Sequence, residues 1–184
     1  MNATYSKAYY ENVSRLLLSR ATKSISQKDP EQVLTATLEM VSHFLNMNKG
    51  RIFLWDTQTA KLVIRYSHGL TAEQIHLGKY EISEGITGEA LGSGNTLVIK
   101  NVKTDPRYTG KVSSSIPKEK WSKSYIAVPI NDADHALGVL AVEYNCNNDE
   151  DVKQSTHILN KIAAMMAKII HQYELNDFSV YQAA

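Results

Sequence analysis

Apolar side chains recur at helical spacing at both ends of the chain and at strand spacing in between. The N-terminal pattern predicts a helix over 9–26 and a second helix that begins with the capping pair Asp29 and Pro30. A third helix is predicted from Glu150 to Tyr173. In the middle of the chain the period is two, which predicts strands over 51–55, 62–67, 97–99, 124–130 and 137–144.

Glycines punctuate the segment 80–99, which ends in the third of these predicted strands. They stand at Gly85, Gly88, Gly92 and Gly94, around a short predicted helical turn. Small residues beside a tight helix, with a strand directly after it, are typical of a wall that a ligand or a neighbouring backbone approaches closely. The alternative is a packing turn that contacts no ligand.

The last predicted helix carries apolar side chains on more than one face. A heptad-like seam is formed by Val152, Leu159, Ile162, Met166, Ile169 and Tyr173. Further apolar residues at 158, 165 and 170 lie off this seam and widen the apolar surface. One face can cover the sheet while the other meets a partner helix, so we expect a homodimer through this helix and the N-terminal one. A purely internal role for both faces is the alternative.

A long polar connection is predicted over 101–123, and connections of this length are usually functional loops. Between Lys100 and Lys123 there are seven Lys and Arg residues against two acidic ones, a local balance of +5. Only Tyr108 and Trp121 are interleaved as aromatics, which is too few for a nucleic-acid surface. A solvated loop and a lip that attracts a small anion are the two remaining interpretations.

The whole-chain composition predicts one globular domain. With 184 residues, 43% apolar residues and a net charge of +1, a full hydrophobic core is expected, without the charge excess of a DNA-binding or membrane-binding protein. No apolar run reaches the roughly 18 residues that span a bilayer, and the N-terminus does not resemble a signal peptide. A cytoplasmic protein without a direct membrane or nucleic-acid partner is therefore expected.

The reactive side chains form no recognisable catalytic or metal-binding motif. The six histidines are scattered, and no nucleophile elbow, P-loop or dinucleotide fingerprint is present. Cys146 is the only cysteine. It lies at the end of a predicted strand with no marked base beside it, so a structural thiol is expected. These patterns predict a protein that is not an enzyme and that holds no metal.

Taken in order, the motifs of the chain resemble those of a GAF domain. The matching segments are 50–56 (GRIFLWD), 62–70 (ending in SHGL), 84–91 (EGITGEAL), 94–102 (GNTLVIKNV), 105–108 (DPRY), 124–130 (SYIAVPI) and 137–143 (LGVLAVE). Within this family the chain is most similar to the N-terminal sensory domains of Nif-specific regulatory proteins, the sigma-54-dependent transcriptional activators of nitrogen-fixation genes. The resemblance covers roughly residues 30–173.

The resemblance implies an α+β fold of the GAF type, which is related to the PAS fold. A central antiparallel sheet would carry the N- and C-terminal helices on one face and a small-molecule pocket on the other. It divides the chain into an N-terminal dimerisation helix (1–29), a GAF sensory domain (30–175) and a tail or truncated linker (176–184). It also implies a homodimer that relays a ligand or partner state through its terminal helices to an ATPase and DNA-binding output. We find no motif of either output module in this chain.

The ligand implied by the resemblance is a small metabolite such as 2-oxoglutarate. The signatures of cyclic-nucleotide, bilin-binding and sulfoxide-reductase relatives are not found. A dicarboxylate requires paired cationic donors, for which Arg65, Arg107 and Lys123 are candidates. Hydroxyl or imidazole contacts are expected from Tyr66, His68, Thr87, Tyr108, Ser124 and Tyr125. Strand alternation places Tyr66 and His68 on the side opposite Arg65, so the two sets cannot line one pocket. A regulatory protein partner is also possible, and the alternative function is a protein-interaction and dimerisation module with no small ligand.

Overall fold

Three long helices form from the apolar stretches at the two ends of the chain. In the computed structural model they are α1 (Lys7–Ile25), α2 (Pro30–Phe44) and α5 (Asp149–Glu174). The predicted cap of α2 is confirmed, since Asp29 accepts a hydrogen bond from the backbone N–H of Glu31 and Pro30 opens the helix. The structure describes residues 6–25, 29–114, 117, 124–132, 135–144, 148–174 and 181–182.

The alternating stretches form one antiparallel sheet in the order β3-β2-β1-β6-β5-β4. The strands are β1 (Met47–Asp56), β2 (Lys61–His68), β3 (Lys79–Tyr80), β4 (Leu97–Ile99), β5 (Ser124–Asp132) and β6 (His135–Tyr144). A short β7 (Tyr181–Gln182) pairs with the beginning of β6. The predicted strands over 51–55 and 62–67 pair as the hairpin of β1 and β2, and the sheet places β1 and β6 at its centre.

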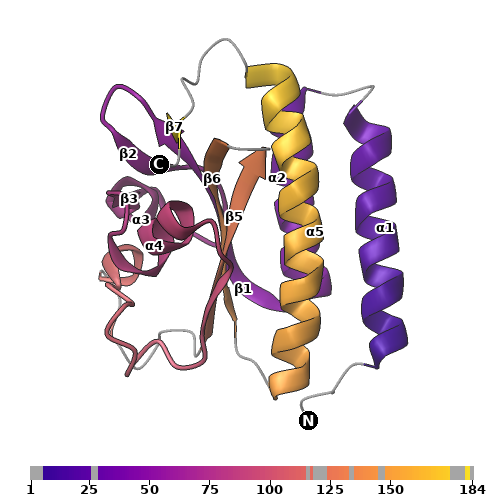
Figure 1. Ribbon diagram of the computed structural model, residues 1–184. Helices are drawn as coiled ribbons and strands as arrows, with labels where there is room; N and C mark the ends of the chain where they lie inside the picture. Colours follow the sequence, from indigo (N-terminus) through magenta and orange to yellow (C-terminus); the bar gives the residue numbers. More distant parts are fainter. Residues whose placement is uncertain are drawn as a thin grey trace.

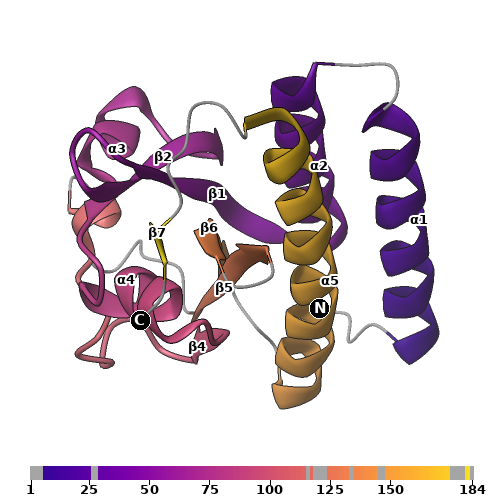
Figure 2. The ribbon, with the colours of Figure 1, turned by 45° about the horizontal axis from the view of Figure 1, so that its top comes forward.

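The three long helices lie on one side of the sheet, as Figures 1 and 2 show. α2 and α5 contact the sheet, and α1 packs on these two helices as an outer layer. Their shared core includes Leu17 of α1, Leu38 of α2, Ile52 of β1 and Ile162 of α5. The predicted α+β arrangement, with its helices on one face of an antiparallel sheet, is confirmed.

The apolar seam predicted on α5 is buried within the chain. Its described members are at most 8% exposed and pack in the core between the helices and the sheet: Val152, Leu159, Ile162, Met166 and Ile169. Both apolar faces of α5 are therefore used internally. The homodimer expected from this seam stays a prediction.

Short elements cover the opposite face of the sheet: α3 (Ala72–Leu77), α4 (Gly85–Ser93) and the single-turn η1 (Lys111–Ser113). α3 begins with a capping box between Thr71 and Gln74. Gly88 of α4 lies against the chain before the helix, because a Cβ added there would stand 2.2 Å from the carbonyl oxygen of Glu81. This close approach of backbone to backbone explains one glycine of the segment 80–99.

None of the helices in the part of the chain that the structure describes is long and apolar enough to cross a membrane.

Candidate functional site

A buried ion pair lies on the sheet face that α3, α4 and η1 cover. Arg51 comes from β1 and Glu143 from β6, and the side chain of each is 1% exposed. Ile52 and Leu54 pack toward the long helices, so the alternation of β1 turns Arg51 and Phe53 to the opposite face. The guanidinium of Arg51 donates to Oε1 of Glu143.

Two tyrosines and a threonine complete the site around this pair. The guanidinium carbon of Arg51 lies 5.3 Å from the centre of the Tyr125 ring, within cation–π range. The Tyr125 hydroxyl is hydrogen-bonded to Oγ1 of Thr87 at 2.8 Å. Tyr108 donates its hydroxyl to Oε1 of Glu143 at 3.2 Å. These five residues, which we call the polar cluster, bring together α4, the loop before η1 and three strands.

Two buried atoms of the polar cluster lack a hydrogen-bond partner: Nε of Arg51 and Oε2 of Glu143. The ammonium group of Lys49 lies 3.9 Å from Oε2, close enough for an ion pair but too far for a hydrogen bond. Buried polar atoms are nearly always satisfied by protein, water or ligand. The polar cluster therefore contains one buried donor, on Arg51, and one buried acceptor, on Glu143, that no described residue satisfies.

The charges of the polar cluster are set by burial and by the ion pair. Burial raises the pKa of Glu143, but Arg51 and Lys49 oppose it and hold that pKa below its ordinary value. Burial lowers the pKa of Arg51, and Glu143 more than compensates, so the guanidinium stays charged. Burial raises the pKa values of Tyr108 and Tyr125, which makes both hydroxyls neutral near pH 7.

Because the pKa of Glu143 is lowered in the folded protein, we expect this carboxylate to affect how stability changes at acid pH. The carboxylate contributes stability above its unfolded pKa of about 4.3, and this contribution is lost as the pH falls through that value toward the lower folded pKa. We expect the stability advantage of the wild type over Glu143→Gln to shrink between about pH 5 and pH 3. Urea unfolding of both proteins at several pH values measures this difference, and a constant difference would contradict it. The other carboxylates are the same in both proteins, so their contributions cancel in the difference between the two unfolding free energies.

Lys111 of η1 connects the short elements that cover the polar cluster. Its ammonium group forms an ion pair with Glu84, the residue before α4, and donates to the carbonyl oxygen of Lys79 at 3.0 Å. It also lies 5.0 Å from the centre of the Tyr80 ring. The side chain of Lys111 thus joins η1 to the start of α4 and to β3. These contacts stabilise the packing of the short elements over the polar cluster.

Three of the residues predicted from the sequence meet in the polar cluster: Thr87, Tyr108 and Tyr125. Ser124 is fully buried but belongs to the helix side of β5, where it pairs with Tyr144 and donates to the carbonyl oxygen of Lys100. Arg107 is exposed and forms an ion pair with Asp105, so its guanidinium is already engaged.

The predicted residues of β2 lie away from the polar cluster. A register shift between Ile52 and Phe53 places Tyr66 opposite Ile52, and Tyr66 packs against the core of the long helices. His68 pairs with Gly50, whose position faces α2, and Arg65 is exposed. Lys123 lies outside the described residues.

The sequence analysis missed Arg51 and Glu143. The available signal was a charged residue at the edge of each of two apolar strands, since buried charges are rare unless paired. Their side chains are 92 positions apart in the sequence, so only the pairing of β1 with β6 brings them together.

Comparison with known proteins finds a family match and several similar nitrogen-fixation proteins. A family model described as GAF domain matches residues 29–170. The nitrogen fixation protein AnfA of Azotobacter vinelandii is 30% identical over 145 residues, which are 79% of this chain and 27% of that protein. A Nif-specific regulatory protein of the same organism is 25% identical over 165 residues, or 88% of this chain and 31% of the relative. The chain thus spans less than a third of the length of these relatives.

Solved structures show the same fold at low sequence identity. The nlh2 GAF domain of A. aeolicus, in an inactive state, has a TM-score of 0.75 at 21% identity and covers 89% of this chain and 98% of that one. A free methionine-R-sulfoxide reductase from Neisseria meningitidis, in complex with its substrate, has a TM-score of 0.73 at 19% identity and covers 95% of this chain and 97% of that one. The fold therefore occurs in a GAF domain and in a sulfoxide reductase.

Proposed function

Because the chain belongs to the GAF domain family, we propose that it senses a small polar metabolite at the polar cluster and passes the signal on through its terminal helices. Its homology to regions of nitrogen-fixation proteins supports a regulatory role. We propose that this role is non-enzymatic, even though the fold also carries sulfoxide reductases. The output that receives the signal would be an ATPase and DNA-binding module of a nitrogen-fixation regulator.

The incompletely satisfied ion pair of Arg51 and Glu143 carries this proposal. Taking two charges out of water costs several kcal/mol per ion, and a well-packed apolar pair of the same volume is often as stable or more stable. Structural stability alone is therefore a weak reason to keep such a pair at the centre of a sheet. Atoms Nε of Arg51 and Oε2 of Glu143 have no hydrogen-bond partner among the described residues, which supports a bound molecule as their partner.

The unpartnered atoms define the chemistry of the proposed ligand. A carboxylate, such as either end of 2-oxoglutarate, supplies the acceptor for Arg51, and Lys49 adds a second positive charge on the same side. An amino or amide group supplies the donor for Glu143. The compounds 2-oxoglutarate, glutamate and glutamine share one carbon skeleton and differ in these groups, so together they test which combination the site accepts.

The two central strands supply a route from the proposed ligand to the helices. Arg51 lies on one face of β1, and its neighbour Ile52 packs in the core of α2 and α5 on the other face. On β6, Ala141 is the pairing partner of Arg51. Its two neighbours, Leu140 and Val142, pack in the core on the helix side of the sheet. A ligand biases the helices through this route only if it binds two helix arrangements with different affinities.

Titration calorimetry with 2-oxoglutarate, glutamate and glutamine tests the proposal. We expect one of them to bind the wild type and to bind Tyr108→Phe about tenfold more weakly, because the variant loses the hydroxyl that orients Glu143, a change of about 1.4 kcal/mol. Tyr66→Phe is the matched control, since Tyr66 lies on the helix side of the sheet, and its affinity should stay within twofold.

Two results would overturn the proposal. No binding by any compound would favour the alternative of a protein-interaction module without a small ligand. Binding that Tyr66→Phe weakens as much as Tyr108→Phe would place the ligand away from the polar cluster.

A further inference from the structure

The outward face of α5 carries a stripe of three lysines, with Glu150 of the first turn at its N-terminal end. Lys153, Lys161 and Lys168 are exposed and lie within one helix face, together with the small residue Ala164. No Asp or Glu occurs in the sequence between 152 and 173. Since α5 rises about 1.5 Å per residue, the three ammonium groups span about 22 Å along the helix.

The nearby carboxylates make their printed contacts with other residues and not with the lysines of this stripe. Asp149 forms an ion pair with Lys100 at 2.7 Å, Asp132 pairs with His171, and Glu150 accepts a hydrogen bond from Gln154. Within the described part of the chain, the three lysines of the stripe form no ion pair. Among the described residues, the part of the stripe beyond Glu150 is therefore a positive surface without an acidic ion-pair partner.

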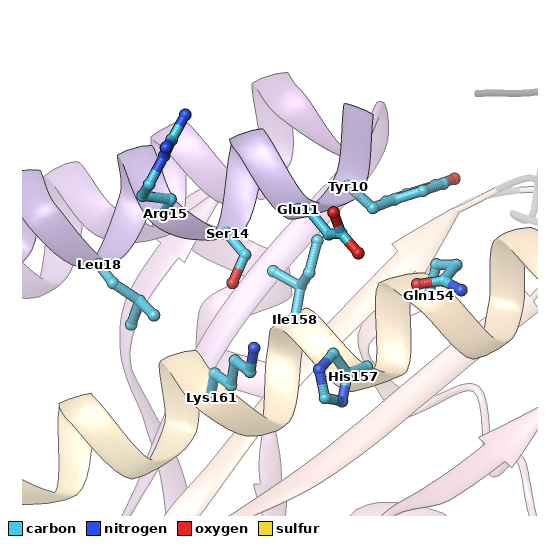
Figure 3. A pocket seen from close by; sticks show the side chains of 9 residues that line it. All are labelled: Tyr10, Glu11, Ser14, Arg15, Leu18, Gln154, His157, Ile158 and Lys161. Atoms are coloured by element: carbon cyan, nitrogen blue, oxygen red, sulfur yellow. The ribbon is translucent and has the colours of Figure 1, made fainter. Parts of the chain in front are cut away.

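A groove of about 440 Å³ runs beside the stripe, between α1 and α5. Figure 3 shows Ser14 and Leu18 of α1 pointing toward Ile158 and Lys161 of α5, while Arg15 points away from the groove. The remaining lining residues are Tyr10, Glu11, Gln154 and His157. Glu11 is the one acidic residue of the lining, and it lies 4.0 Å from Lys7 in an exposed ion pair. The groove thus combines apolar contacts with the positive rim of α5.

We propose that the groove between α1 and α5 docks an acidic helical segment of a partner protein. An apolar side chain of that segment would enter the groove and pack on the partly exposed Leu18, above the buried Ile158, and carboxylates along the same segment would face Lys153, Lys161 and Lys168. This is the helix-in-groove mode of recognition, in which apolar anchors give affinity and charges give register and association rate. The surface lies on the opposite side of the sheet from the polar cluster, so it goes beyond the proposed ligand site.

Other occupants fit this surface less well. A metabolite does not reach along a stripe of about 22 Å. Nucleic acid would gain from the lysines but not from the apolar contact at Leu18. A second copy in parallel register would bring an equally positive face against this one, and like charges repel.

The test is binding of a fluorescein-labelled helical peptide to the full chain, measured by fluorescence anisotropy. The peptide has 18 residues, built from Ala and Glu with two leucines four positions apart, and its control has every Glu replaced by Gln. The protein variant Lys161→Glu/Lys168→Glu reverses the stripe. Its matched control, Lys79→Glu/Lys103→Glu, makes the same charge change at exposed positions outside α1 and α5.

We expect the acidic peptide to bind the wild type and the control variant within twofold of each other, and the stripe variant at least tenfold more weakly. Replacing the two peptide leucines by Ala should weaken binding by a comparable factor. The proposal is overturned if the peptide does not bind, if the Gln peptide binds equally well, or if a 20-base-pair DNA duplex binds more tightly. It is also overturned if sedimentation shows a homodimer that the stripe variant dissociates.

Discussion

Replacing Arg51 by Met is expected to lower the free energy of unfolding by about 3–5 kcal/mol, the usual cost of breaking a buried ion pair from one side. The reason is the environment of Glu143, whose side chain is 1% exposed and would be left as an unpaired buried carboxylate. Urea unfolding at pH 7, followed by circular dichroism, measures the change as a shift of the midpoint at constant slope.

The double variant Arg51→Met/Glu143→Leu separates the charge from the packing. Removing both charges leaves nothing unpaired, so we expect it to regain most of the loss and to approach the stability of the wild type. This recovery would also show that the pair is kept for a reason other than stability, which the proposed ligand site requires. A double variant as unstable as Arg51→Met alone would mean that the volume and contacts of Arg51, including its position over Tyr125, carry the effect.

Gly138→Ala is expected to cost about 3 kcal/mol or more, at the upper end of the usual range for overpacking. Gly138 pairs with Leu54 in the centre of the sheet, and a Cβ added there would stand 2.0 Å from the carbonyl oxygen of Phe53. That contact is with backbone, so β1 and β6 have to move apart, and the ladder that holds Arg51 beside Glu143 moves with them.

Gly94→Ala is the matched control for this effect. Gly94 ends α4 with a φ of +64°, and an added Cβ would meet nothing closer than 3.6 Å, so only the backbone strain of about 1 kcal/mol applies. Thermal unfolding of both variants should show a clearly larger fall in melting temperature for Gly138→Ala. An equal fall in melting temperature for the two variants would mean that the sheet relaxes around the methyl group of Ala at position 138.

Local sequence determined most of the secondary structure of this protein. The helix starts at Asp29 and Thr71 and the hairpin at 56–61 depend on residues that are close along the chain, so their physical causes are all visible in the sequence. The sequence also identified Thr87, Tyr108 and Tyr125 as candidates for the site. The order of motifs was sufficient to identify the family and hence the layer arrangement.

Tertiary structure decided which faces and charges meet. The register shift in β1 and β2 turns Tyr66 toward the helices, and the packing of α1 and α2 on α5 buries the seam that a partner helix was expected to cover. The ion pair of Arg51 with Glu143 arises from strands far apart in the sequence, and its energy depends on burial by η1 and α4. Periodicity reports only which residues share a face of one element, whereas register, burial and long-range pairing are set by the contacts of all elements together.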